Sequence, residues 1–410
     1  MRVRNIIKCA FVAITMLFMA SISDVVNAQN STYSPYSRYG LGELGNYCPA
    51  AYRGIGGVRY GLRSNRTINA AQPASYTACD SMTFMFDLSV HVDWSLFEDG
   101  AGKRNKFNGN LDYITLQFPL WKQHIAMSLG LLPYSKLGYQ ITLNGNVDDK
   151  YHYSKIYTGE GGITDLYAGL SGNLFDWVAL GFNFYYMFGE VTNTRELIFQ
   201  EAGLNSTTKV TDIDVSTIRL RYGLQLFHDF GKHSFVVGGI YEHKANINGT
   251  YTDVVVSTDI DTVPHNKNGL SMPSIFGVGG SYTWNRALTV ALDYEYQFWS
   301  KAELMDEPLK DCNRISAGVE YRHNPYGKNY AERMFWRAGC SFSDSYIKAV
   351  GGKDLRVSIG MGFPLRTSGT LFNVTLEYNR RGISGGLWEN GLQLTINAAV
   401  RENWFFKRKL

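Results

Sequence analysis

The chain has 410 residues, of which 40 are lysine or arginine and 36 are aspartate or glutamate, giving a formal net charge of +4. So small a net charge argues against nucleic acid as a partner, and a mean hydropathy of −0.19 argues against a membrane-spanning helix after the first 28 residues. The chain has 27 tyrosines, 23 phenylalanines and 42 glycines but only 10 prolines, a composition that favours strands and tight turns.

The first 28 residues have the pattern of a secretory signal peptide. Basic residues at positions 2, 4 and 8 precede an apolar run over residues 9–20, and Val26-Asn27-Ala28 offers side chains that a signal peptidase reads. The run is shorter than the roughly 20 apolar residues that a membrane-spanning helix requires. We therefore predict that residues 1–28 are a cleaved signal peptide, whose removal leaves 37 basic and 35 acidic residues.

Residues 29–80 are rich in glycine, serine, asparagine and tyrosine, and they show no strand-like alternation. Irregular backbone of this kind is stable at membrane depth only where protein shields it from lipid. We predict that this segment is a plug inside a barrel. A disordered periplasmic tail is the alternative.

Four cysteines follow the signal peptide, at positions 48, 79, 312 and 340, and they allow three pairings. An oxidising periplasm permits disulfides. A bond between Cys48 and Cys79 is favoured because both lie in the same early segment. Free buried thiols are the alternative.

From residue 81 onward, apolar and polar residues alternate with the period of two that is typical of strands. Over residues 288–299 the even positions are leucine, valine, tyrosine and phenylalanine, whereas the odd positions include Asp293 and Glu295. Such segments run about ten residues or more, which suits tilted membrane strands of about 9–11 residues better than soluble strands of roughly 5–6. We predict an all-β fold: a 14-stranded antiparallel transmembrane β-barrel over residues 81–406, with an N-terminal lumenal plug and a basic tail at 407–410.

The connections between the predicted strands are of two kinds. Those at one end are mostly short, as expected of periplasmic turns, and those at the other end are mostly longer, as expected of external loops. The longest predicted external loops are 137–160, 193–210 and 247–269, and the link 324–333 is long for a periplasmic turn. The predicted strands are 81–94, 107–121, 124–136, 161–173, 176–192, 211–228, 233–246, 270–284, 287–300, 312–323, 334–345, 352–363, 371–380 and 390–404.

The inward faces of these strands carry full charges of both signs, including Asp293, Glu295, Arg219 and Arg221. Isolated charges are costly in a low-dielectric wall, so we expect them to pair across the lumen or with the plug. The chain has no HExxH, GxSxG or CxxC motif, and its eight histidines are scattered. We therefore predict no enzymatic activity, no cofactor and no metal site.

Short stretches of the chain carry a family resemblance. Arg53-Gly54-Ile55-Gly56-Gly57 and Asn69-Ala70-Ala71-Gln72-Pro73-Ala74 resemble the N-terminal hatch of the FadL/TodX (OMPP1) family of outer-membrane transporters. Residues 34–40 and 402–409 resemble an uncharacterised branch of that family. The resemblance implies fourteen strands, a plug, and passive uptake of long-chain fatty acids or other hydrophobic small molecules. The family's hatch usually reads Asn-Pro-Ala, whereas this chain has Gln72-Pro73-Ala74.

The resemblance also implies a lateral exit, through a break in the wall near the third strand and the hatch. The third predicted strand contains Gly130 and Pro133, and a proline removes a donor from the strand ladder. We therefore take Gln72, Pro73, Ala74, Gly130 and Pro133 as candidate ligand and gate residues. A proline that ends the strand at the outer rim is the alternative.

Two functions remain open from the sequence. One is passive uptake of a hydrophobic small molecule with lateral exit, favoured by the hatch and Pro133. The other is a structural or accessory barrel subunit of an outer-membrane secretion or barrel-assembly complex, favoured by the charged lumen and the polar loops. We expect a multi-pass barrel in a bacterial outer membrane, with membrane lipid, a hydrophobic ligand and possible protein subunits as partners, and no nucleic acid.

Overall fold

The computed structural model describes residues 32–403, apart from 46, 100–101, 148–150, 200–203, 258–259, 266–269, 305–307, 349–351, 366–368 and 383–385. The predicted signal peptide and the basic tail lie outside the described residues. Within the described ranges, no helix is long and apolar enough to cross a membrane.

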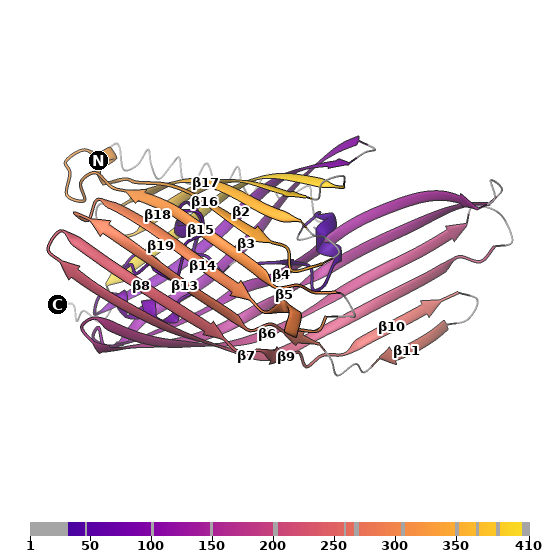
Figure 1. The fold of residues 1–410 in the computed structure, drawn as a ribbon, viewed down its shortest axis with the longest axis horizontal. Helices are drawn as coiled ribbons and strands as arrows, with labels where there is room; N and C mark the ends of the chain where they lie inside the picture. Colours follow the sequence, from indigo (N-terminus) through magenta and orange to yellow (C-terminus); the bar gives the residue numbers. More distant parts are fainter. Residues whose placement is uncertain are drawn as a thin grey trace, which may run out of the picture.

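Fourteen antiparallel strands form a closed barrel (Figure 1). The ring closes where the last strand pairs with the first, from Trp388↔Glu98 to Asn403↔Thr83. The predicted fold class and strand number are confirmed. The ring strands are β2 (Thr83–Asp99), β3 (Gly102–Trp121), β4 (Ile125–Val147), β5 (Tyr151–Phe175), β6 (Val178–Phe199), β7 (Thr207–Phe230), β8 (His233–Glu242), β13 (Ile275–Trp284), β14 (Leu288–Gln297), β15 (Cys312–Tyr321), β16 (Phe335–Asp344), β17 (Lys353–Pro364), β18 (Leu371–Gly382) and β19 (Trp388–Asn403).

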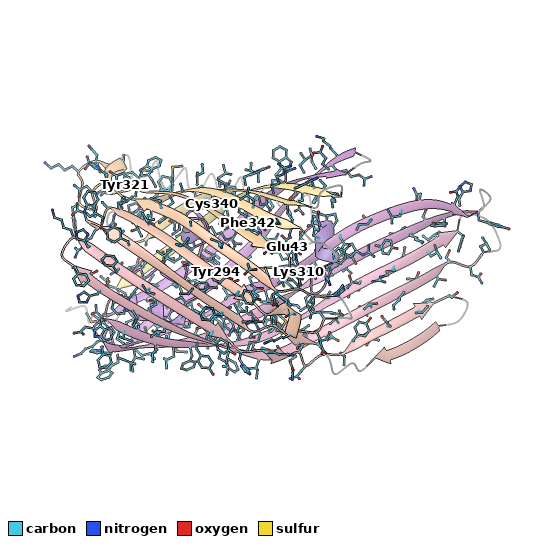
Figure 2. The ribbon with its side chains drawn as sticks, in the orientation of Figure 1. Glu43, Tyr294, Lys310, Tyr321, Cys340 and Phe342 are labelled. Carbon is cyan, nitrogen blue, oxygen red and sulfur yellow. The ribbon has the colours of Figure 1, made fainter. Side chains whose placement is uncertain are left out.

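The strands alternate between a lumenal and an outward face. On β7, Arg219, Arg221 and Gln225 are buried inside the barrel, whereas Ile218 and Tyr222 are half exposed on the outside. Tyr294, Tyr321 and Phe342 are further exposed aromatic residues on the outer surface (Figure 2). Side chains alternate across a strand, so one face can meet lipid while the other packs in the lumen.

Four strands are far longer than a membrane crossing needs. β4, β5, β6 and β7 have 23, 25, 22 and 24 residues, whereas a tilted crossing takes about 9–11. Beyond the row that contains Leu137 and Ile213, these strands continue together with β10 (Tyr251–Val256) and β11 (Ile260–His265) as an open sheet to one side of the barrel (Figure 1). We call this part the external sheet.

The predicted external loops 137–160 and 193–210, and part of 247–269, are therefore wrong as loops, because they are largely strand. In β4, a bulge between Pro133 and Ser135 inserts one residue. One extra residue exchanges the two faces of a strand. Before the bulge the odd positions face outward, as Leu131 does, whereas after it Leu137 and Tyr139 are buried. In β4 the alternation of the sequence therefore breaks at this exchange, although the strand continues to Val147.

A hydrophobic cluster lies at the mouth next to the external sheet. Leu137, Ile163 and Met187 of the long strands pack there against the links that follow β8 and β14. These links contain β9 (Ala245–Asn246), β12 (Ser271–Met272) and the 3₁₀ helix η3 (Trp299–Lys301), and Trp299 stacks on Tyr346 with ring centroids 4.3 Å apart. The opposite end bears the short turns and the short helix α3 (Tyr330–Arg333) in the predicted long link 324–333, and by this asymmetry it is the periplasmic end.

Residues 32–80 fold inside the barrel, where most of their side chains are buried. They form η1 (Pro35–Arg38), the two-residue β1 (Glu43–Leu44), α2 (Ala50–Arg53) and η2 (Pro73–Ala78). The backbone at Gly56 lies so close to the wall that a Cβ there would come within 2.5 Å of the carbonyl oxygens of Ala317 and Cys340. The glycines of the Arg53–Gly57 motif therefore let this segment pack directly against β15 and β16.

The favoured disulfide is wrong. Cys48, Cys79, Cys312 and Cys340 are all free thiols. Cys48 packs with Ile55 and Val58, whereas Cys79 belongs to a separate cluster with Tyr76. The fold separates the two cysteines by packing Cys48 in a cluster with Ala291 of β14 and Cys79 in a cluster with Met85 of β2.

Candidate functional site

The barrel wall is interrupted between β3 and β4. The ladder between these strands runs from Trp121↔Ile125 to Ile114↔Leu131 and stops there. Beyond that point β3 continues paired with β2, and β4 continues paired with β5. Within the described residues, the outer halves of β3 and β4 do not pair with each other, and we call this gap in the strand ladder the opening.

A bulge on each strand accompanies the separation. On β4 the bulge lies at Pro133, which has no N–H to donate to a neighbouring strand. On β3 the pairing with β2 shifts so that Asp112 is skipped between Leu111 and Tyr113. A bulge bends its strand and increases the local twist, and here both strands are bent where their common ladder ends.

The lumenal segment covers this opening from the inside. In β1, Glu43 and Leu44 pair antiparallel with Lys136 and Ser135 of β4. The N–H of Gly45 donates to the carbonyl oxygen of Tyr134 at 2.6 Å, so the bulged residue of β4 is bonded to the plug. The plug therefore supplies backbone partners to β4 just beyond the point where β4 stops pairing with β3.

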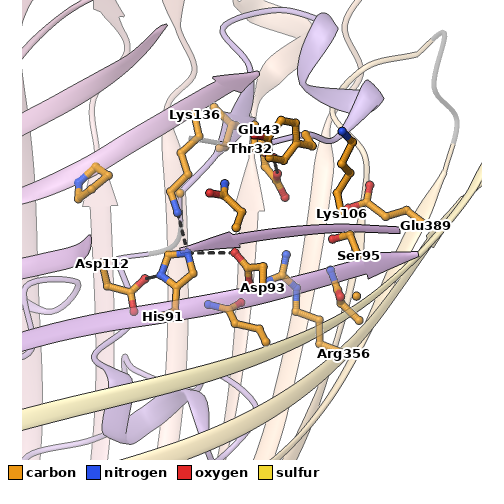
Figure 3. A pocket seen from close by; sticks show the side chains of 18 of the residues that line it. Thr32, Glu43, His91, Asp93, Ser95, Lys106, Asp112, Lys136, Arg356 and Glu389 are labelled. Carbon is orange, nitrogen blue, oxygen red and sulfur yellow. Dashed lines mark hydrogen bonds and ion pairs between the residues drawn. The ribbon is translucent and has the colours of Figure 1, made fainter. Parts of the chain in front are cut away.

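The side chains that line the opening are charged (Figure 3). His91 Nδ1 lies 2.6 Å from a carboxylate oxygen of Asp112, and His91 Nε2 lies 3.1 Å from Asp93. Lys136 Nζ reaches across the opening from β4 to within 2.9 Å of His91 Nε2. Arg53 of the plug pairs with Asp112 at 2.8 Å. The bulge directs Asp112 inward, where it links the wall to the plug.

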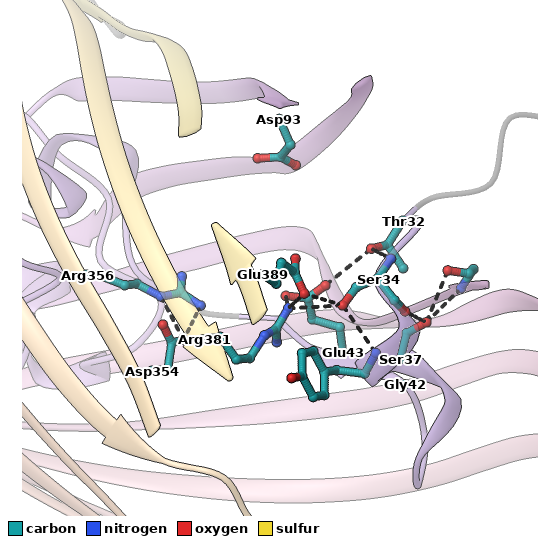
Figure 4. Close-up of polar contacts among 12 residues, drawn as sticks. Thr32, Ser34, Ser37, Gly42, Glu43, Asp93, Asp354, Arg356, Arg381 and Glu389 are labelled. Carbon is teal, nitrogen blue, oxygen red and sulfur yellow. Dashed lines mark hydrogen bonds and ion pairs between the residues drawn. The ribbon is translucent and has the colours of Figure 1, made fainter. Parts of the chain in front are cut away.

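A second ionic cluster lies at the start of the plug (Figure 4). Arg381 of β18 pairs with Glu43 at 3.1 Å and with Glu389 at 3.0 Å, and Ser34 donates a hydrogen bond to Glu389 at 2.6 Å. Deeper in the lumen, Arg59 pairs with Glu295, and the N–H of Tyr60 donates to Asp293 at 2.8 Å. The expectation that the inward charges pair with one another and with the plug is confirmed.

The structure separates the predicted site residues into two groups. Gln72, Pro73 and Ala74 lie against β6–β8, and the Gln72 amide donates to the carbonyl oxygens of Leu224 and Gly239. Pro133 lies instead beside Gly45, at the edge of the opening. Gly130 lies in the intact ladder between Thr115 and Tyr167. Gln72-Pro73-Ala74 therefore anchors the plug to the wall at a distance from the break at Pro133.

The charged residues of the opening were missed from the sequence. His91 and Lys136 are 45 positions apart on different strands, and nothing in the chain order brings them together. One signal was present, since Leu111 and Ile114 both face outward although they are three positions apart. An interrupted period of two indicates a bulge, and it marks Asp112 as a residue with an altered direction.

The external sheet is held together by polar contacts as well as by its ladders. Asp253 of β10 accepts hydrogen bonds from Thr211 Oγ1 at 2.6 Å and from Lys209 Nζ at 2.8 Å. Burial raises the pKa of the Asp253 carboxyl, but these hydrogen bonds lower it by more, so the net pKa lies below its ordinary value. The carboxylate is charged at neutral pH and fixes the β10–β11 hairpin to β7.

The fold is shared with solved transporter structures at low sequence identity. The toluene transporter TodX of Pseudomonas putida aligns with a TM-score of 0.61 and 15% identity over 89% of this chain and 100% of its own. The toluene transporter TbuX of Ralstonia pickettii aligns at 0.60 and 14% over 89% and 99%. A FadL homologue of Pseudomonas aeruginosa aligns at 0.58 and 11% over 89% and 100%. These likenesses establish a barrel of the FadL type.

Sequence comparison adds one family. No curated protein matches the chain. The model of the family described as BamG matches residues 6–410, which is nearly the full length. The chain therefore belongs to the BamG family.

Proposed function

We propose that this chain is an accessory barrel subunit of an outer-membrane assembly complex. The observation that carries the proposal is the external sheet, in which four ring strands continue beyond the barrel and are joined by β10 and β11. Strands that serve only to cross a membrane need about 9–11 residues. The additional length presents backbone edges and side chains outside the membrane, which is what a docking subunit requires. The family name BamG points to the same assembly-related role.

The interior of the barrel also supports a structural role. The plug is tied to the wall by buried ion pairs, among them those of Arg53 and Arg59. The opening beside Pro133 is lined by His91, Asp112 and Lys136. A hydrophobic molecule that passes there would separate these charged groups from their partners without solvating them. Leaving charges both unpaired and unsolvated is unfavourable in free energy.

Hydrophobic uptake is the second candidate function. The specific observation in its favour is the loss of the β3–β4 ladder at Pro133, in a fold shared with transporters of toluene. A ligand that used this route would have to displace β1 from β4, because Glu43, Leu44 and Gly45 bond to the bulge.

The accessory role is tested by removing the β10–β11 hairpin. Native membranes are solubilised gently, and the proteins that remain with the wild-type chain are compared with those that remain with a variant lacking residues 251–265. We expect a stoichiometric protein partner with the wild type and its loss from the variant, because the deletion removes the last two strands of the external sheet.

The control changes an exposed segment at the other end of the barrel, residues 326–329, to glycine and serine. It should keep the partner, and all three proteins should show the gel shift of a folded barrel on heating. A wild-type protein that purifies alone from native membranes would contradict the accessory role.

A further inference from the structure

The external sheet and the outer half of β3 have exposed backbone edges, and these edges differ in how they are protected. Proteins protect exposed strand edges with lysines, prolines, bulges or covering segments, because an unprotected edge pairs with other strands. At the edge that faces the opening, the outer half of β3 carries Lys103, Arg104 and Lys106. On the far side of the sheet, β11 contains Pro264, which removes a ladder donor.

The edge of β4 that faces the opening has no such protection. Residues 139–145, Tyr-Gln-Ile-Thr-Leu-Asn-Gly, include no charged residue and no proline, and three of them, Tyr139, Ile141 and Thr142, favour strands. Within the described chain, no strand pairs with this stretch on the side away from β5. Leu143 is 52% exposed there, although its neighbours on the same face, Tyr139 and Ile141, are more covered.

The chain already uses the beginning of this same edge. β1 pairs antiparallel with Ser135 and Lys136, and the next contact outward is made by Ser37, which bonds to both the N–H and the carbonyl oxygen of Gly138. The edge therefore has backbone partners as far as Lys136 and a side-chain partner at Gly138, and then continues without a paired strand over residues 139–145.

We propose that a β-strand of a partner polypeptide adds to β4 along residues 139–145, continuing the pairing that β1 begins. This inference rests on the proposed accessory function and names its contact. Side chains alternate along a strand, so the incoming strand places apolar residues on the face of Tyr139, Ile141 and Leu143. Its polar residues lie beside Gln140, Thr142 and Asn144. The added strand covers Leu143 and satisfies the free backbone groups, which is the mode of recognition known as β-augmentation.

Two substitutions test whether the partner binds the β4 edge or another part of the external sheet. Leu143→Lys places a charge on the open edge, as protected edges do, and should release the partner. Ile198→Lys is the matched control, because it adds the same charge to β6, an inner strand of the sheet. Ile198 lies opposite Ser154 of β5, which in turn lies opposite Asn144 of β4. Ile198 is 38% exposed, so both variants should fold, and heat-dependent gel mobility verifies this.

Amide hydrogen exchange then tests strand addition directly. It is measured by mass spectrometry on the native complex and on the same chain after the partner has been dissociated. We expect amides within 139–145 to exchange about tenfold more slowly in the complex, since new hydrogen bonds must open before exchange. Exchange within 103–109 of β3 should be unchanged.

The outcomes distinguish the inference from the function on which it rests. Slower exchange in 139–145, with the partner lost from Leu143→Lys and kept by Ile198→Lys, supports strand addition. A partner that binds while exchange in 139–145 stays the same overturns strand addition and leaves the accessory role intact. If no protein accompanies the wild-type chain, both are overturned.

Discussion

At the scale of single residues, the direction of a side chain decides its environment. Leu394 on β19 is 39% exposed and faces outward, whereas its neighbour Thr395 is fully buried in the lumen. The lumen is filled by the plug, so a buried inward position tolerates a larger side chain no better than a protein core does. Gln393 is different, because it is inward but lines the cavity at the opening.

We expect Leu394→Arg to lower the free energy of unfolding by about 2–4 kcal/mol if the residue lies near the membrane midplane, because the guanidinium enters hydrocarbon. Gln393→Arg, on the adjacent position of the same strand, should change it far less, since its side chain reaches a polar cavity. Denaturant titration of the barrel in lipid vesicles measures both. Equal losses for the two variants would show that the faces of β19 have been assigned wrongly.

At the scale of elements, the plug is fixed by close backbone approach as well as by ion pairs. Gly56 has a φ of 77°, in the left-handed region that glycine favours. A Cβ at this position would also collide with backbone of β15 and β16. Both constraints exclude a side chain, so this glycine is a sensitive point of contact between plug and wall.

Gly56→Ala should therefore weaken plug docking by about 1–3 kcal/mol, which is typical of overpacking. In planar bilayers we expect the wild type to conduct few ions and Gly56→Ala to show frequent openings. Gly239→Ala is the control, because a Cβ there meets nothing closer than 3.7 Å. Conductance of Gly56→Ala that matches the wild type would argue that the plug does not control the lumen.

At the scale of the whole molecule, one fold is compatible with two functions. The barrel has the architecture of hydrocarbon transporters, with a break in the wall at Pro133. The same molecule has a charged opening, a hydrophobic cluster at its mouth and an external sheet. A fold does not establish a function, so the route for a ligand has to be tested apart from the docking surface.

The variant Pro133→Val distinguishes the transport function from the accessory function. Valine restores a backbone donor and favours a strand, and it should narrow the opening. From the accessory role we expect uptake of a radiolabelled long-chain fatty acid to be equal in cells with the wild type, the variant or no protein. A fall in uptake with Pro133→Val, at normal folding and surface display, would instead favour the transporter.

Much of the fold is encoded locally and could be predicted from the sequence. The period of two in segments such as Leu288–Gln297 depends only on strand geometry, and strand length indicates a membrane barrel. The break near Pro133 was also visible, because a proline acts on its own ladder wherever it lies. The inward charges of Glu295 and Arg219 implied partners, although not which ones.

What the sequence did not reveal depends on contacts between distant segments. The length of β4 was missed because the bulge at Tyr134 exchanges its faces, and only the pairing with β5 shows that the strand continues. The tertiary structure alone decided that Gln72-Pro73-Ala74 lies on β6–β8, away from Pro133, and that Cys48 and Cys79 stay apart. It also brought His91, Asp112 and Lys136 together at the opening. Periodicity reports which face a residue occupies, whereas barrel closure and the path of the plug decide which faces meet.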